Sequence, residues 1–493
     1  MKKLYIKAIA ALLLGGSAVS CGDDFLDSKL YDGFDINEGL TSVNRVHYAL
    51  NGCYDRLFRY YFAGNYATSF GDIGSDITYW NQQTNHFTDI YRFTPTADDT
   101  YLYYIWNYGY KVCDNSARVI EAGEALLDKV EGDELKDLQM YLAEAHALRA
   151  YGHFYLVNVF GHQVKVNGQD FSNTPGIVVI DKHIPENTQV SRSTVGDAYT
   201  AIINDLDESI RLFDLAGKTQ GSKVYFTPAA VYGLRSRVKL YLEDFQGSIN
   251  DAKDALTAGR NPQLAYTPES YAALYDGGGS NTESFFYLAI TSMDNWSANS
   301  CGTLWSSYSY GPNGYLQSLM ADTDVRASIW SWSADSYGDI YFDSGKFSAF
   351  TYGNPAVGTN YLINAPEMYL NQAEGYLRQA TPDIASAQNA LLVVAKRNTA
   401  ITSVADLPST ADDLMKFIQD ERARELFQEG HRLWDLRRWD ITANLYATGD
   451  WDEIKYMING FKVSDCVYPI PNDEINAGFG VKQNEGWFNT FPE

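Results

Sequence analysis

Hydrophobic side chains recur at helical spacing in several blocks of this chain. From Leu138 to Val159, apolar or small residues return after three, four or seven positions, and polar residues fill the positions between them. The segment from Leu414 to Leu433 follows the same period, and residues 367–377 have a similar character. Because this spacing places the apolar residues on one face, the pattern predicts amphipathic helices that pack against one another.

Two segments with this pattern align as an internal repeat. Residues 147–161 and 233–247 share a Leu-Arg-small triplet, a Tyr-Leu pair at the same offset and a final glycine, Gly161 or Gly247. Each glycine follows a helix-length run, so we expect it to cap the helix in a conformation with positive φ. Small residues on one face let neighbouring helices approach closely, as arrays of helical repeats require. The repeat therefore predicts helix pairs similar to tetratricopeptide units.

Two long stretches, 60–110 and 281–357, hold neither a helical nor an alternating period for long and are rich in aromatic residues. Their Trp and Tyr residues stand among Ser, Gly, Asn and Asp. Long loops in a protein are usually functional or disordered, and an aromatic content this high argues against disorder. No Pro-, Ser- or Gly-rich linker divides the chain. We therefore expect one continuous unit in which ordered loop excursions leave a helical body.

The first residues of the chain read as a targeting segment. Three lysines open it, and the apolar stretch at 6–19 is shorter than the about 20 residues that a transmembrane helix needs. Small residues at 18–20 precede Cys21 and resemble a lipobox, and cleavage there would leave Cys21 as a lipidated N-terminus. Secretory cleavage without a lipid is the alternative. The acidic pair at 23–24 resembles the surface-export signal of Bacteroidetes lipoproteins.

The mature chain would be strongly acidic. Removal of residues 1–20 would take away three lysines and no acidic residue, which leaves 35 of the 38 Lys and Arg residues against 62 Asp and Glu, a formal charge of −27. Such a field repels phosphate backbones, so we do not expect nucleic acid as a partner. It also disfavours large polyanionic ligands, unless a local basic pocket offsets the field.

Four cysteines follow the predicted lipidation site: Cys53, Cys113, Cys301 and Cys466. They show no CxxC spacing, which leaves zinc sites and thioredoxin-like chemistry without support. Four cysteines in about 470 residues do not make a disulfide framework. We expect buried free thiols, with oxidation of one pair during export as the alternative.

Several segments, taken in order, carry a resemblance to a known family over nearly the whole chain. The most specific segment is ERARELFQEGHRLWDLRRWD at 421–440. The other segments are DDFLD at 23–27, AEAHALRAYGHFYLVNVFG at 143–161, DTDVR at 322–326, APEMYLNQAEGYLR at 365–378, YPIPNDEI at 468–475 and KQNEGW at 482–487. On these segments the chain resembles the SusD/RagB family of surface nutrient-binding lipoproteins. Glu485 departs from the family, which often has proline there.

The resemblance implies a mainly α fold, a tetratricopeptide-like α-superhelix with long, aromatic-rich loop excursions and few short strands. It also implies a lid on a TonB-dependent SusC-like transporter, with the helical face toward the barrel and the loops holding the ligand. The expected parts are a lipoprotein signal peptide at 1–20, a lipidated tether at 21–40, an N-terminal helical part with a loop excursion at 41–280, an aromatic-rich excursion at 281–357 and a C-terminal helical part at 358–493.

One C-terminal segment interleaves carboxylates and guanidinium groups. On a helix, three pairs would stand three positions apart on one surface: Glu421 with Arg424, Glu429 with Arg432, and Arg432 with Asp435. Such pairing keeps carboxylates ionised, whereas a general acid needs a raised pKa. We therefore interpret this segment as a structural ion-pair network and not as a catalytic site.

The sequence offers no motif of a catalytic or metal site. The seven histidines show no HExxH or comparable ligand spacing, and no GxSxG, P-loop or GxGxxG context occurs. Carboxylate pairs for glycoside hydrolysis are defined by their separation in space, so a sequence does not locate them. We therefore expect neither an enzyme nor a bound metal or cofactor.

Sugar recognition, by contrast, has positive support in the aromatic stretches. Pyranose rings present apolar faces and polar rims, which suit flat aromatic side chains beside amides and carboxylates. The resemblance implies a ligand site built from N-terminal loops and the later excursion, which correspond here to 71–86 and 294–315. Core packing is the alternative for each ring, since large aromatic residues are mostly buried. The stacking candidates are Trp80, Trp296, Trp305, Tyr308 and Tyr310, and the hydrogen-bonding candidates are Asp76, Asn81 and Asn295.

We therefore expect a lipid-anchored, cell-surface protein of the outer membrane that captures an oligosaccharide or polysaccharide and delivers it to a TonB-dependent SusC-like transporter. One alternative is a peptide- or protein-capturing RagB-like lipoprotein, whose groove would bond to peptide backbones. A surface glycosidase and a structural adhesin without a small ligand are further alternatives.

Overall fold

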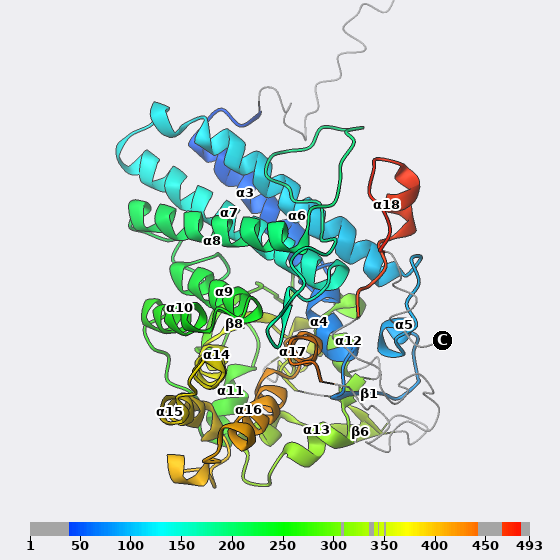
Figure 1. Ribbon diagram of the computed structural model, residues 1–493, viewed down its shortest axis with the longest axis vertical. Helices are drawn as coiled ribbons and strands as arrows, with labels where there is room; N and C mark the ends of the chain where they lie inside the picture. Colours follow the sequence, from blue (N-terminus) through cyan, green and yellow to red (C-terminus); the bar gives the residue numbers. More distant parts are fainter. Residues whose placement is uncertain are drawn as a thin grey trace, which may run out of the picture. The chain divides into compact units, whose positions relative to one another are not determined.

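The helical blocks of the sequence form long helices in the computed structural model (Figure 1). Within the N-terminal half, helices that follow one another in the chain pack side by side. The long helices are α3 (Val43–Phe58), α6 (Thr100–Glu124), α7 (Gly132–Phe160), α8 (Val195–Ala216), α9 (Pro228–Tyr241), α10 (Phe245–Ala258), α14 (Ala365–Arg378), α15 (Ile384–Ala395) and α16 (Ala411–Leu426). The pairs in contact include α6 with α7, α7 with α8, α9 with α10, and α14 with α15.

The structure describes residues 39–306, 310–334, 340–343, 345–349, 352–441 and 466–484. The predicted signal peptide and the predicted lipidation site Cys21 lie outside these residues, as does Tyr308. Ser42–Glu493 is grouped as one compact unit, and every element described below belongs to it. No helix within the described ranges is both long enough and apolar enough to cross a membrane.

Helices α6 and α7 approach each other through small residues. A Cβ added to Gly152 of α7 would lie 2.6 Å from Sγ of Cys113 in α6. A Cβ added to Gly109 of α6 would lie 2.8 Å from a methyl carbon of Leu156 in α7. Both positions leave no room for a side chain, because protein interiors are close-packed. The small residues of the 147–161 segment therefore permit the close helix packing predicted from the sequence.

The two glycines that end the sequence repeat do not cap helices with positive φ. Gly161 follows α7 in an extended conformation, with φ of −120°. Gly247 lies in the first turn of α10, where its N–H donates to the carboxylate of Asp244 at 3.0 Å. Asp244 caps α10 shortly after α9 ends at Tyr241, so the turn between the two helices falls before Gly247. The residue with positive φ in this turn is Glu243, at 58°. The predicted C-cap at Gly247 was wrong because the aligned segment, residues 233–247, runs across the turn between α9 and α10.

Short antiparallel strand pairs fasten the loop excursions to the rest of the unit. Each sheet in the described ranges has two strands. Both strands of the pair β4–β8 contact α9. The pairs are β1 (Thr78–Trp80) with β5 (Tyr310–Pro312), β2 (Lys165–Val166) with β3 (Gln169–Asp170), β4 (Ser284–Tyr287) with β8 (Tyr361–Asn364), and β6 (Trp332–Ala334) with β7 (Ile340–Phe342). The predicted fold class, mainly α with few short strands, is confirmed.

Short helices occupy the excursions and the connections. The short α-helices are α4 (Tyr66–Ile73), α5 (Thr88–Tyr91), α11 (Pro268–Leu274), α12 (Cys301–Ser306), α13 (Gly314–Leu319), α17 (Arg432–Arg438) and α18 (Asn472–Ala477). The 3-10 turns are η2 (Leu127–Lys129), η3 (Ser297–Asn299), η4 (Val325–Ile329), η5 (Pro355–Val357) and η6 (Val404–Asp406).

Of the four cysteines after the predicted lipidation site, Cys53, Cys113 and Cys301 are buried free thiols, and Cys466 is buried as well. This confirms the expectation of buried thiols. Burial raises the pKa of the Cys53 and Cys301 thiols to about 12, so both stay protonated and unreactive at neutral pH.

Candidate ligand-binding surface

The two stretches that the resemblance assigned to the ligand site meet in space. Strand β1 comes from residues 71–86 and strand β5 from residues 294–315, and the two strands pair antiparallel with Trp80 opposite Tyr310. The N-terminal loop and the later excursion are thus joined by backbone hydrogen bonds.

Three of the predicted stacking residues are nevertheless buried at this junction. Trp80, Trp305 and Tyr310 expose 6%, 2% and 0% of their surface. The Trp80 indole N–H donates to the Thr84 carbonyl at 2.8 Å, and the Tyr310 hydroxyl donates to the His86 carbonyl. A ring enclosed on both faces offers no platform to a sugar, so the structure places these three residues in the core instead of at a binding surface. Tyr308 lies outside the described residues.

Asp76 is held by an ion pair and is not available as a hydrogen-bonding residue for a ligand. Its carboxylate accepts two hydrogen bonds from the Arg432 guanidinium, at 2.7 and 2.9 Å. Its backbone carbonyl accepts a third from the Asn313 side chain at 2.9 Å. The sequence instead predicted Arg432 to pair with Glu429 and Asp435 along one helix, which the structure contradicts.

The two predicted asparagines shape turns. The Asn81 side-chain oxygen accepts from the Gln83 backbone N–H at 3.0 Å. The Asn295 side-chain oxygen accepts from the Ser297 backbone N–H at 2.9 Å, and its amide donates to the Thr291 carbonyl at 2.9 Å. Asn295 is partly exposed, and it holds the turn that presents the next residue, Trp296.

Partly exposed tyrosines gather where the end of α3 meets α6. Tyr61, in the turn after α3, stacks on Tyr104 of α6 with ring centroids 4.0 Å apart and an interplanar angle of 23°. The rings of Tyr60 and Tyr108 lie 3.9 and 4.9 Å from Tyr61, and Tyr66 meets Tyr60 edge-on at 5.6 Å. Each of these five side chains keeps part of its surface in solvent. We call Tyr60, Tyr61, Tyr66, Tyr104 and Tyr108 the tyrosine cluster.

The local sequence explains how the tyrosine cluster forms. Tyr104 and Tyr108 stand one turn apart in α6, so their rings lie on the same face of the helix. A hydrogen bond with Tyr60, followed by partial burial, raises the pKa of Tyr61. Partial burial, followed by the contact with Tyr61, raises the pKa of Tyr104. The phenols therefore stay neutral at physiological pH and offer hydroxyl groups beside their ring faces.

Trp296 joins the later excursion to the tyrosine cluster. Its indole N–H donates to the Phe58 carbonyl at the end of α3, at 3.1 Å. Its ring centroid lies 4.9 Å from that of Phe58 and 5.8 Å from that of Tyr60. Trp296 is half-buried, unlike the other predicted stacking residues that the structure describes. Among the predicted stacking residues that the structure describes, Trp296 is therefore the one at the surface.

Sequence reasoning missed the tyrosine cluster itself. The aromatic richness of residues 60–110 was evident, but the contact of Tyr61 with Tyr104 depends on how α3 packs against α6. The one local signal was the spacing of Tyr104 and Tyr108, which places two rings on one helical face.

A second, partly exposed aromatic pair joins β1 to β6. Tyr79 stacks against Trp332 of β6 with centroids 6.0 Å apart and an interplanar angle of 25°. Trp332 exposes 38% of its surface, and the buried Phe342 supports it edge-on. Because neighbouring residues of a strand point to opposite faces, Tyr79 faces away from the buried side of Trp80.

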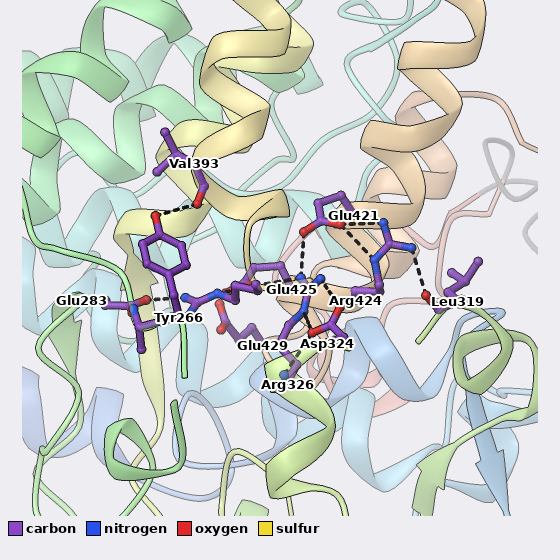
Figure 2. A network of polar contacts seen from close by, with 12 residues as sticks. Tyr266, Glu283, Leu319, Asp324, Arg326, Val393, Glu421, Arg424, Glu425 and Glu429 are labelled. Atoms are coloured by element: carbon purple, nitrogen blue, oxygen red, sulfur yellow. Dashed lines mark hydrogen bonds and ion pairs between the residues drawn. The ribbon is translucent and has the colours of Figure 1, made fainter. Parts of the chain in front are cut away.

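The predicted ion pair of Glu421 with Arg424 is present and belongs to a larger buried network. Figure 2 shows Arg326 between the carboxylates of Asp324, Glu421 and Glu425, at 2.7, 2.8 and 3.0 Å. Arg424 pairs with Glu421 at 2.5 Å. Burial opposes ionisation of Glu421, but the charges of Arg326 and Arg424 outweigh it and lower the pKa of Glu421 to about 2. An acid this strong does not serve as a proton donor at neutral pH.

The rest of the predicted ladder is replaced by tertiary contacts. Glu429 pairs with Lys346 at 2.5 Å, and Asp435 pairs with Arg422 at 2.8 Å. The reason is that α16 ends at Leu426 and α17 begins at Arg432, with Gly430 between them at a φ of 77°. The ion pairs thus connect different elements instead of running along one helix.

Within the described ranges, no group of three or more His, Cys, Asp and Glu side chains is placed to hold a metal ion. The tyrosine cluster, by contrast, combines partly exposed aromatic surface with hydroxyl groups. This arrangement suits non-covalent binding of a ligand that has apolar faces and a polar rim.

Comparisons with known proteins identify the family. A model described as the SusD family matches residues 293–487, and a model described as starch-binding, associating with the outer membrane, matches residues 24–240. The starch-binding protein SusD of Bacteroides thetaiotaomicron is 36% identical over 132 residues. That match covers 26% of this chain and 21% of SusD, so the matched stretch spans about a fifth of the relative.

Solved structures extend the likeness over most of the chain. A SusD superfamily protein from Bacteroides thetaiotaomicron is 22% identical with a TM-score of 0.78, covering 90% of this chain and 99% of that one. Another from Bacteroides vulgatus is 24% identical with a TM-score of 0.77, again covering 90% and 99%. These structures confirm the predicted tetratricopeptide-like helical fold. With both family models matched in this order along the sequence, the chain belongs to the SusD/RagB-like family.

Proposed function

We propose that this protein captures oligosaccharides at the cell surface without cleaving them and delivers them to a TonB-dependent SusC-like transporter. The observation that carries the proposal is the tyrosine cluster with Trp296 beside it, a partly exposed group of rings from the turn after α3, the start of α4, α6 and the later excursion. The matched relative is a starch-binding protein, and one matched family is described as starch-binding and associated with the outer membrane.

The chemistry of the tyrosine cluster supports sugar binding. The rings of Tyr60, Tyr61 and Tyr104 lie in sequence with centroids 3.9 and 4.0 Å apart. Because Tyr61 stacks between Tyr60 and Tyr104, a sugar would meet the exposed edges of these rings and their phenol hydroxyls, not the faces that the rings share. Tyr66 and Trp296 also pack against Tyr60 and hold the row in place. A supported platform loses little conformational freedom on binding.

Anchoring would make even weak capture effective. Cleavage before Cys21 and lipidation would hold the protein at the outer membrane, with more than one acyl chain for a stable anchor. Association with the transporter would raise the local concentration of the ligand at the pore. Both steps are part of the proposal and follow from the family resemblance.

The carboxylates that the structure describes give little support to a catalytic function in glycan hydrolysis. Glu374 and Glu421 lie in the core, and opposing arginine charges outweigh burial and lower the pKa of each to about 2. Burial raises the pKa of Glu144 to about 8, as a general acid requires, but its side chain is fully buried and out of reach of a glycan. We therefore propose a binding protein and not a glycosidase.

Calorimetry on the chain without residues 1–21 tests this proposal, with a panel of plant, fungal and host glycans and a mixture of peptides. The informative variant combines Tyr61→Ala and Tyr104→Ala, which removes the stacked pair. The matched control is Tyr48→Ala, a well exposed tyrosine on α3 away from the described ring contacts of the cluster. Trp332→Ala tests the second aromatic pair separately.

Glycan binding that the double variant weakens by about tenfold or more, with Tyr48→Ala unchanged, would support the proposal. A loss confined to Trp332→Ala would move the site to the Tyr79–Trp332 pair. Binding of peptides alone would favour the peptide-capturing alternative, and hydrolysis of the glycan during the titration would contradict the non-catalytic assignment.

A further inference from the structure

Three basic side chains border the tyrosine cluster. Arg56 lies in the last turn of α3, Arg59 follows that helix, and Lys111 lies on α6 one turn beyond Tyr108. The Lys111 ammonium lies 4.4 Å from the centroid of the Tyr108 ring. The Arg59 guanidinium carbon lies 5.2 Å from the Trp296 ring. Both cations therefore stand next to rings of the proposed platform.

These three cations have little local compensation. Asp55 pairs with Arg59 at 2.6 Å and with Arg56 at 3.4 Å, so two arginines share one carboxylate. Among the residues that the structure describes, no carboxylate lies within ion-pair distance of Lys111. The nearby Asp114 is already engaged by Arg118 at 2.9 Å and by His183 at 2.7 Å.

The local excess of positive charge contrasts with the chain as a whole, whose formal charge is −24. A structural reason exists for Arg56, because a cation in the last turn of a helix interacts favourably with the helix dipole. That reason does not apply to Lys111, which lies in the middle of α6. Partial burial, and then the charge of Arg56, lower the pKa of Lys111, so this cation is held at a cost that a bound anion would relieve.

Resting on the function proposed above, we propose that the captured glycan is acidic and carries carboxylate or sulfate groups. Its anionic group would lie between Arg56 and Lys111, while its sugar rings would lie against the exposed edges of the stacked Tyr61 and Tyr104 rings. Charge-assisted hydrogen bonds from arginine and lysine to such groups are stronger than neutral ones. The two cations would also offset the repulsion that the acidic chain otherwise exerts on a negatively charged ligand.

Calorimetry with matched charged and neutral ligands tests this inference. The probes are oligogalacturonate hexasaccharides, the same hexasaccharides as methyl esters, chondroitin sulfate and heparin fragments of equal length, and maltohexaose. The esters keep the sugar rings and remove the charge, so the comparison needs no change in the protein. Lys111→Met keeps much of the apolar stem and removes the ammonium. Lys218→Met is the matched control, because that lysine forms a half-exposed pair with Asp137 away from the cluster.

We expect at least one acidic glycan to bind about tenfold or more tightly than every neutral probe. This advantage should shrink in high salt and in Lys111→Met but persist in Lys218→Met. Binding of oligogalacturonate, which carries carboxylates alone, would indicate recognition of a carboxylate, whereas binding confined to the chondroitin sulfate or heparin fragments, which carry both groups, would indicate that sulfate is required. Equal or tighter binding of the neutral probes would overturn this inference and leave the proposed function standing, whereas the absence of binding to both classes would overturn both.

Discussion

The carboxylate of Asp76 and the guanidinium of Arg432 form a two-point ion pair, with N–O distances of 2.7 and 2.9 Å. It joins the turn before β1 to the start of α17, 356 positions later in the chain. The Arg432 backbone N–H also donates to Asp72 at 3.2 Å, and the Gly430 N–H donates to the other oxygen of Asp72 at 3.0 Å. The C-terminal segment therefore fixes the turn that leads into β1, the strand that carries Tyr79.

We expect Asp76→Ala to lower the free energy of unfolding by about 3–5 kcal/mol, because it leaves the buried Arg432 charge without its partner. Urea unfolding followed by fluorescence measures this change. The matched control is Asp137→Ala, whose partner Lys218 is as exposed as Asp137 itself. Loss of an exposed pair costs no more than about 1 kcal/mol. Equal effects of the two substitutions would contradict the structural role given to Asp76.

Gly71 of α4 marks a place where two backbones touch. A Cβ added there would lie 2.0 Å from the carbonyl oxygen of Gly430. We expect Gly71→Ala to lower the free energy of unfolding by about 1–3 kcal/mol, because the crowded atoms belong to the backbone and not to a flexible side chain. The matched substitution is Gly52→Ala, in α3, where a Cβ meets nothing within 4 Å.

Gly52→Ala should raise the free energy of unfolding by up to about 1 kcal/mol, since alanine is the better helix former. Chemical denaturation of both variants provides the measurement. Opposite signs for the two glycines are the expected result. A neutral Gly71→Ala would show that α4 and the Gly430 turn are not in contact.

The helices were predictable because their signal is local. The period of apolar residues from Leu138 to Val159 lies inside α7, and residues 367–377 lie inside α14. Turn positions were less certain: the repeat placed a cap at Gly247, whereas Asp244 begins α10 three residues earlier by accepting the Gly247 N–H. A repeat shows that two segments are alike, but it does not show where the helix in each segment ends.

The candidate surface was less predictable because it depends on tertiary contacts. The sequence favoured Trp80, but strand β1 turns that ring inward and its neighbour Tyr79 outward. Tyr61 and Tyr104 meet only because α3 packs against α6. Trp296 was foreseen as an aromatic in the excursion, although its position beside the cluster was not.

Glu144 on α7 is a buried carboxyl group without a cationic partner in the described ranges. Its two oxygens accept hydrogen bonds from the Tyr54 hydroxyl at 2.7 Å and from the Gln220 amide at 2.9 and 3.0 Å. Burial raises its pKa to about 8, although both hydrogen bonds lower it. In the unfolded chain the same group titrates near its ordinary value of about 4.3.

Between these two pKa values the folded chain holds one more proton than the unfolded chain at this site. Stability contributed by Glu144 is therefore present below about pH 4.3 and falls as the pH rises toward about 8, by up to about 1.4 kcal/mol per pH unit. Glu144→Gln keeps the shape of the neutral acid and removes its titration. We expect the variant to gain stability over the natural chain as the pH rises from about 5 to about 8.

The free energy of unfolding of both proteins, measured in urea across that pH range, checks this expectation. Glu421→Gln serves as the opposite case, because Arg326 and Arg424 outweigh its burial and lower its pKa to about 2. The stability that Glu421 contributes is present above its unfolded pKa and is lost only as the pH falls toward about 2. We therefore expect Glu421→Gln to be less stable than the natural chain by an amount that changes little between about pH 5 and 8. If the free energy of unfolding of Glu144→Gln and of the natural chain changed with pH in the same way, Glu144 would already be ionised in the folded protein. The contacts of Glu144 with Tyr54 and Gln220 would then have to stabilise a buried negative charge.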